Sequence, residues 1–93
     1  MILGFADDET ERFFREGVCP ARWRAISNVI ARKLDMLDEA RALETLRSPP
    51  GNRLESLKAD RHGQFSIRVN DKWRVCFVWT RGGPDRVEVV DYH

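Results

Sequence analysis

The sequence lacks the features that mark several common protein classes. It has two cysteines and two histidines, and their spacing matches no familiar zinc site. No apolar run approaches the roughly 20 residues that a membrane-spanning helix needs, and residues 2–6 lead directly into Asp7 and Asp8 without a basic region or a cleavage site. These absences predict a cytoplasmic protein with no metal, cofactor, disulfide or membrane span.

Length and composition predict a single domain over residues 1–93. Hydrophobic residues make up 42% of the chain and charged residues 33%, a balance typical of a folded protein. The net charge of +1 is unevenly spread: residues 47–93 have nine basic and six acidic residues, whereas residues 1–46 have seven and nine. The C-terminal half is therefore the better candidate to meet phosphates, although so small an excess predicts weak binding to free RNA and also fits an ordinary solvated surface.

The N-terminal half has mainly helical patterns. Residues 2–6 predict a short strand, and Asp8–Glu11 predict the start of a helix with an Asp cap. Gly17–Pro20 break that helix. Apolar residues then recur every three or four positions over Ala21–Leu37, which predicts an amphipathic second helix, and Glu39–Glu44 predict a short third one.

After residue 52 the hydrophobic period becomes two, which is typical of strands. Turn signals at Asn70-Asp71 and Gly82–Pro84 separate the runs into an antiparallel meander. The expected strands are Arg53–Lys58, Gln64–Val69, Trp73–Trp79 and Arg86–Tyr92. The sequence thus predicts an α+β fold in which an N-terminal strand and two helices pack on one face of a mainly antiparallel sheet.

The alternation assigns different residues to the two faces of this sheet. The side expected to face the helices has Phe65, Ile67, Val69, Val75, Phe77 and Trp79. The other side, expected to be open, has Ser66, Arg68 and Arg74, and the cations Arg53, Lys58 and Arg61 precede it in the chain. These residues predict a phosphate-binding surface, although basic residues also protect sheet edges from aggregation.

The last three residues, Asp91, Tyr92 and His93, combine groups suited to proton transfer and base stacking. A terminal histidine can equally be frayed and inert. Glu55 and Glu88 are further candidate bases, although exposed strand carboxylates are usually not catalytic.

Three stretches of the chain resemble the HigB or plasmid-maintenance killer-protein family of the RelE superfamily. They are PPGNRLESLKADR over residues 49–61, GQFSIRVNDKWRVCF over residues 63–77, and the ending VEVVDYH. The resemblance spans essentially the whole chain. It implies a RelE-like fold and a toxin of a type II toxin-antitoxin system that cuts mRNA in the ribosomal decoding site without a metal. The implied partners are the 70S ribosome with its mRNA and a HigA-like helix-turn-helix antitoxin. The toxin is expected to contact operator DNA only through this antitoxin.

The resemblance also implies roles for individual residues. Two features depart from the family pattern: Ala59 replaces the usual glycine of the turn, and Glu55 stands where some relatives have a catalytic histidine. The general base is therefore open at this point. Matching positions are Lys58, Asp60 and Arg61 for the basic turn, Arg74 for the WR arginine, and Asp91, Tyr92 and His93 for the terminal active-site residues. We therefore expect catalysis by Lys58, Arg74, Asp91, Tyr92 and His93. Together with the sheet-face assignment, we expect RNA phosphates to bind Arg53, Lys58, Arg61, Arg68 and Arg74.

Two other functions use the same residues. A non-catalytic module could block translation by binding RNA or the ribosome through the same cations. A pure interaction domain could dock a partner through its acidic, helical N-terminal half and have an inert sheet.

Overall fold

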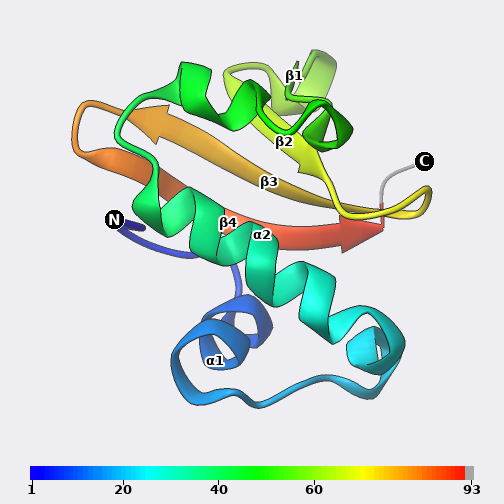
Figure 1. The fold of residues 1–93 in the computed structure, drawn as a ribbon. Helices are drawn as coiled ribbons and strands as arrows, with labels where there is room; N and C mark the ends of the chain where they lie inside the picture. The colour runs from blue at the N-terminus through cyan, green and yellow to red at the C-terminus, as the bar shows by residue number, and fades with distance from the viewer. Residues whose placement is uncertain (92–93) are drawn as a thin grey trace.

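The computed structural model describes residues 1–91, which form two α-helices, four short 3-10 helices and one antiparallel sheet of four strands. The sheet order follows the chain, β1-β2-β3-β4. Figure 1 shows both α-helices on one side of the sheet, with α2 lying across it and α1 beside β4. The bounds are α1 Asp8–Glu16, α2 Ser27–Glu39, β1 Glu55–Ser56, β2 Gln64–Arg68, β3 Trp73–Thr80 and β4 Gly83–Asp91.

Helix α1 has an aspartate N-cap and a glycine C-cap, as the sequence predicts, but the N-cap is Asp7 and not Asp8. The carboxylate of Asp7 accepts a 2.8 Å hydrogen bond from the backbone amide of Thr10, and Gly17 ends the helix in the left-handed conformation with φ +74°. The hydroxyl of Thr10, which is fully buried, accepts a hydrogen bond from the amide of Val89 at 3.2 Å. This bond fastens the first helix to the last strand.

The expected second helix is divided into two elements, and the expected third helix is wrong. A 3-10 helix, η1, covers Ala21–Ile26, and α2 follows it directly. Helix α2 ends because Ala40 takes an extended backbone conformation, and a 3-10 turn, η2, follows at Leu43–Arg47. The extended link lets Leu46 turn back into the core, where 2% of its surface remains exposed.

The expected first strand is reduced to a single parallel bridge between Phe5 and Val87. The amide of Ala6 donates to the carbonyl of Val87 at 2.9 Å, and the amide of Val87 donates to the carbonyl of Gly4 at 3.1 Å. The pairing does not continue along β4, because the amide of Val89 donates to the Thr10 hydroxyl of α1 instead. Next to the bridge β4 contains a bulge, at which Arg86 has φ +52° and the register with β3 shifts.

Strand β1 is also shorter than expected. Arg53, where the strand was expected to begin, has a left-handed backbone with φ +44°, and the 3-10 turn η4 starts at Ala59 soon after the strand ends. Only Glu55 and Ser56 are left to pair with β2.

The hydrophobic core lies between the sheet and the helices, as the alternation predicts. Ile67, Val75 and Phe77 are fully buried, and Phe65 and Trp79 pack against the core while partly exposed. None of the helices within residues 1–91 is long and apolar enough to cross a membrane.

One buried polar pair holds the segment that leads into β1. The amide oxygen of Asn52 accepts a hydrogen bond from the ammonium of Lys33 on α2. Its amide nitrogen donates to the carbonyls of Leu46 at 3.1 Å and Ser48 at 3.2 Å. Burial lowers the pKa of Lys33, because removal from water penalises its charged form.

Candidate functional site

The sheet face opposite the helices contains a row of polar residues. Residues directly opposite each other on antiparallel strands share a face. The register therefore aligns Glu55 on β1, Ser66 on β2, Cys76 on β3 and Glu88 on β4. Arg74 lies on this same face, two residues before Cys76. We call this surface the Arg74 face.

Arg74 is held in one orientation by several oxygen atoms, including the backbone carbonyl of Ser66 at 3.4 Å from Nη2. Its Nε donates a 2.7 Å hydrogen bond to the Ser66 hydroxyl, and its Nη2 donates at 2.7 Å to the backbone carbonyl of Arg53. The same nitrogen lies 3.7 Å from a carboxylate oxygen of Glu55. These contacts join β3 to β2, β1 and the loop before β1.

The expectation that Arg74 and Ser66 stand on an exposed surface is wrong. Ser66 is fully buried, and Arg74 keeps 8% of its surface exposed. The reason is that the guanidinium reaches sideways over Ser66 to the Arg53 carbonyl, which the turn before β1 brings within reach. Buried arginines need such polar partners, because an unpaired buried charge is costly.

Arg61 extends over the same face from the turn η4. Its guanidinium donates to the side-chain oxygen of Gln64 at 3.1 Å and lies 3.5 Å from a carboxylate oxygen of Glu88. The fully buried thiol of Cys76 lies in the same row of the sheet. Burial raises its pKa to about 11, so this thiol is protonated at neutral pH and is a poor nucleophile.

Glu55 is the accessible carboxylate beside Arg74. Its side chain is 52% exposed, compared with 22% for Glu88. The sequence indicated both residues as possible bases but could not separate them, because the register between β1 and β2 has no local sequence signal. In the structure, Glu55 is the one that faces both solvent and the buried guanidinium.

The other predicted cations are distributed around this face. The side chains of Arg53 and Lys58 are exposed, and the backbone carbonyl of Lys58 accepts a 3.1 Å hydrogen bond from the amide of Arg61. Arg68 is the direct cross-strand neighbour of Arg74, and its guanidinium forms an ion pair with Asp71. The structure thus places Arg61, Arg68 and Arg74 at this side of the sheet by side-chain contacts, and Arg53 and Lys58 near it by their backbone contacts.

Asp91 is not part of this group. It pairs with Trp73, whose ring packs on Trp23 in the core, so its Cβ points toward the helix side of the sheet. Its carboxylate lies 3.7 Å from the ammonium of Lys72. The other two C-terminal candidates, Tyr92 and His93, lie outside the described residues.

The chemistry available at the Arg74 face is that of a cation and a carboxylate. An oriented guanidinium can bind a phosphate through several hydrogen bonds, and a neighbouring carboxylate can accept a proton from a hydroxyl group. Within residues 1–91, no three His, Cys, Asp or Glu side chains are grouped so that they could hold a metal ion.

Comparison with known proteins identifies the family. Residues 3–93 match the family described as the RelE-like toxin of type II toxin-antitoxin system HigB. The chain belongs to this HigB toxin family. Its resemblance to HigB proteins in sequence is thereby confirmed, and a HigB toxin implies an antitoxin as its partner.

Two relatives and one solved structure agree with this membership. The chain is 42% identical to Toxin HigB-1 of Vibrio cholerae over 86 residues, which cover 88% of this HigB chain and 87% of the relative. It is 38% identical to an uncharacterized protein of Haemophilus influenzae over 74 residues, covering 78% and 73%. The fold is similar to that of the Staphylococcus aureus YoeB dimer, with a TM-score of 0.57, 20% identity and coverage of 99% and 94%. The predicted RelE-like α+β fold is confirmed.

Proposed function

We propose that this HigB toxin is an endoribonuclease that cuts mRNA in the decoding site of the ribosome without a metal ion. The observation that carries the proposal is the buried Arg74, held by Ser66 and the Arg53 carbonyl beside the accessible carboxylate of Glu55. A cation fixed before the substrate arrives needs little reorganisation to stabilise charge that develops on a phosphate. Nuclease activity is also what membership in this toxin family implies.

The proposed reaction is attack by an RNA 2′-hydroxyl on the adjacent phosphate. Glu55 takes the 2′ proton as the oxygen forms its bond to phosphorus, and Arg74 stabilises the negative charge on the phosphate oxygens. The bond from phosphorus to the 5′ oxygen then breaks, and that oxygen takes up a proton. The products are a 2′,3′-cyclic phosphate and a free 5′-hydroxyl.

We also propose roles in this reaction for the other residues that the sequence indicated. His93 donates the proton to the leaving 5′ oxygen, Asp91 positions His93, and Tyr92 stacks on a base. Arg53, Lys58, Arg61 and Arg68 bind the reacting phosphate or its neighbours together with Arg74. Lys58 has the most direct access to RNA, because its side chain is exposed and forms no ion pair with any of residues 1–91.

Dependence on the ribosome follows from weak electrostatics. The net charge is only +1, and two cations near the site are already paired, Arg61 with Glu88 and Arg68 with Asp71. Binding of free RNA depends on unpaired cations that release counterions. The ribosome would instead supply the alignment of the mRNA, which is worth several kcal/mol in a well-oriented intramolecular attack.

Because ribosomes are cytoplasmic, the proposed activity requires the toxin to be in the cytoplasm. We also propose that its antitoxin is a HigA-like helix-turn-helix protein and that the toxin meets operator DNA only through it.

The test compares free mRNA with mRNA on programmed 70S ribosomes, using the purified toxin with and without EDTA. Ribosome integrity is checked by sedimentation. We expect cuts only on ribosomes, with 5′-hydroxyl ends at mapped positions, and the same rate in EDTA. Efficient cutting of free RNA at physiological salt contradicts the proposal, and arrested translation with intact mRNA supports a non-catalytic inhibitor instead.

A further inference from the structure

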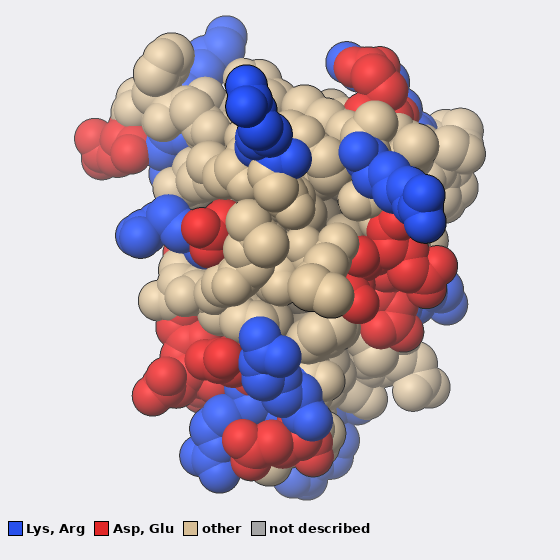
Figure 2. Space-filling view, turned by 90° about the vertical axis from the view of Figure 1, so that its left-hand side faces the viewer, with Lys and Arg blue, Asp and Glu red and all other residues tan. Residues whose placement is uncertain are grey.

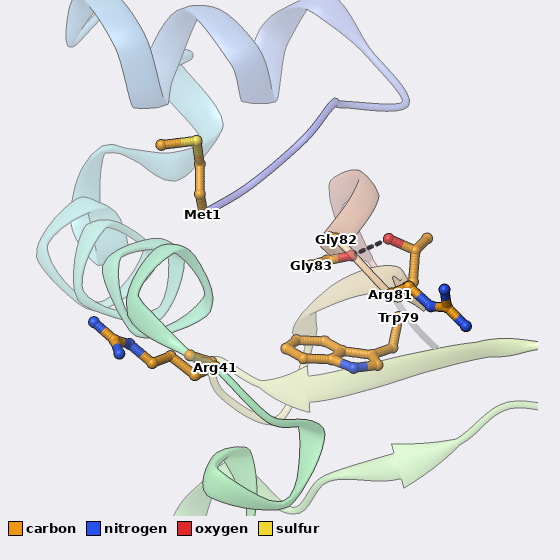
Figure 3. A pocket seen from close by; sticks show the side chains of 8 residues that line it. Met1, Arg41, Trp79, Arg81, Gly82 and Gly83 are labelled. Atoms are coloured by element: carbon orange, nitrogen blue, oxygen red, sulfur yellow. Dashed lines mark hydrogen bonds between the residues drawn. The ribbon is translucent and has the colours of Figure 1, made fainter.

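A groove lies on the helix side of the molecule, between the end of α2 and the turn that joins β3 to β4. Its main part is a pocket of about 440 Å³ lined by residues that include Met1, Arg41, Trp79 and Arg81. A second pocket of about 410 Å³ shares Ala40 and Arg41 with it and continues toward Met36 and Leu46. We call the two pockets together the hairpin groove. Figure 3 shows the Trp79 ring between the side chains of Arg41 and Arg81.

The two arginines of the groove have no acidic partner in the part of the chain that the structure describes. Neither Arg41 nor Arg81 forms an ion pair with any of residues 1–91. Arg15 and Arg22 are compensated, because they pair with Glu11 and Glu9. The exposed Arg24 and Arg32 also form no ion pair within residues 1–91, but they lie outside the groove. The groove therefore presents two uncompensated positive charges on either side of an indole ring.

The same end of the molecule exposes apolar surface. Met1 and Leu3 are 77% and 49% exposed, and Met1 lines the groove. In Figure 2, which faces the side where the β3–β4 turn lies, uncharged residues fill the centre and charged side chains stand around them. Tryptophan and arginine are enriched at the energetic centres of protein interfaces. Exposed apolar side chains beside them favour a protein partner over RNA.

One wall of the groove is already fixed. The Thr80 hydroxyl donates a 2.7 Å hydrogen bond to the carbonyl of Gly83 and so closes the turn. Gly83 has φ +132°, and a Cβ there would lie 2.6 Å from the backbone oxygen of Met1. A preformed wall lowers the ordering cost of binding.

The hairpin groove is separate from the Arg74 face. Trp79 packs against the core on the helix side of β3, whereas Arg74 points to the opposite side. The two residues are also five positions apart along the strand, which corresponds to about 16 Å. A partner in the groove would leave Arg74 uncovered unless it wraps around the sheet.

We propose that the hairpin groove docks an acidic segment of the antitoxin, with its carboxylates on Arg41 and Arg81 and an apolar side chain against Trp79. This inference rests on the toxin-antitoxin membership and not on the cleavage mechanism. The opposite charges and the exposed apolar surface supply the two complementary parts of the interface.

The test uses the toxin and its purified antitoxin. Binding is measured by calorimetry for the wild type and for the double variant Arg41→Glu/Arg81→Glu. The matched control is Arg24→Glu/Arg32→Glu, which makes the same charge change at two exposed positions outside the groove. Cleavage on programmed ribosomes and melting temperature are measured for all three proteins.

We expect the groove variant to raise the Kd for the antitoxin about tenfold or more and the control to change it far less. The wild-type affinity should fall more steeply with added salt than that of the groove variant. In cells, the groove variant should stay toxic while the co-expressed antitoxin no longer neutralises it. Trp79→Ala, checked for folding, should weaken binding at high salt as well, because it removes the apolar contact.

Two results overturn the proposal. The first is an unchanged antitoxin affinity of the groove variant. The second is loss of cleavage with normal antitoxin binding, which would assign the groove to RNA or the ribosome. Absence of cleavage by the wild type would refute the proposed nuclease but leave the binding comparison intact.

Discussion

The Nε of Arg74 lies 2.7 Å from the hydroxyl oxygen of Ser66 on the neighbouring strand, and both residues are buried. The buried cation of the site, Arg74, is therefore also part of the packing of the sheet. Its contact with the Arg53 carbonyl extends this role to the loop before β1. Substitutions at this site must be judged by activity and folding together.

Replacing Arg74 with alanine should lower cleavage on ribosomes by roughly 100- to 1,000-fold, because loss of a preorganised charge-stabilising donor costs about 2.7–4 kcal/mol. Arg24→Ala is the control, since Arg24 is exposed on η1 and far from the site in sequence. Single-turnover rates at a temperature where both variants are folded provide the comparison. Equal rates in the two variants would remove Arg74 from the mechanism.

Glu55→Gln should reduce the cleavage rate by about 100-fold or more, which is the usual contribution of a general base. The shape of the side chain is kept, so ribosome binding should change little. Glu44→Gln is a suitable control, because Glu44 is an exposed carboxylate paired with Arg47 on η2. An undiminished rate for Glu55→Gln would show that another group takes the 2′ proton.

A chain ending at residue 91 tests the proposed roles of Tyr92 and His93. We expect it to fold with an almost unchanged melting temperature, because the core and β4 remain complete. Cleavage and growth arrest should be lost, since the proposed proton donor and stacking group are missing. Normal cutting by the shortened chain would assign these two residues to an inert terminus.

Asn52→Ala should lower the free energy of unfolding by about 2–4 kcal/mol. The change leaves the Lys33 ammonium and two carbonyls without the hydrogen bonds that the amide group supplies, and unsatisfied buried groups cost about 1–3 kcal/mol each, partly relieved by water. Asn28→Ala, at an exposed position of α2, is the control. Urea unfolding of both variants measures the difference, and equal midpoints would contradict a structural role for Asn52.

The Cys76 thiol should make the protein less stable at alkaline pH. Burial raises its pKa to about 11 from an ordinary value of 9.0, so the unfolded chain loses this proton first. Stability is unaffected well below pH 9 and falls as the pH rises toward 11, by about 1.4 kcal/mol between pH 8 and pH 10. Unfolding of Cys76→Ala should lack this component, whereas Cys19→Ala should keep it.

Local signals in the sequence predicted much of the fold. The end of α1 at Gly17 and the buried side of β2 and β3 depend on neighbours within a few residues, and these predictions are confirmed. The N-cap of α1 is an aspartate as predicted, but it lies one residue earlier, at Asp7. Asn52 was not predicted to be buried, because a polar residue after two prolines is typical of an exposed turn.

The geometry of the site depended on long-range contacts that the sequence does not encode locally. Arg74 is buried because a carbonyl 21 residues earlier, that of Arg53, meets its guanidinium. The face of the sheet on which Asp91 lies follows from its pairing with Trp73 and from the bulge at Arg86. No glycine or other turn residue at position 86 indicated the bulge. The shared face of Ser66, Arg68 and Arg74 could be predicted from the alternation, but the burial of Ser66 and Arg74 could not.

The hydrogen bond from the Val89 amide to the Thr10 hydroxyl spans 79 positions of the chain, and it has a consequence for synthesis. During translation α1 emerges early, but the strand that completes its packing is made last. Contacts between distant parts of a chain delay folding until both parts exist. A nascent toxin is thus expected to stay incompletely folded, and so harmless, until β4 has been synthesised.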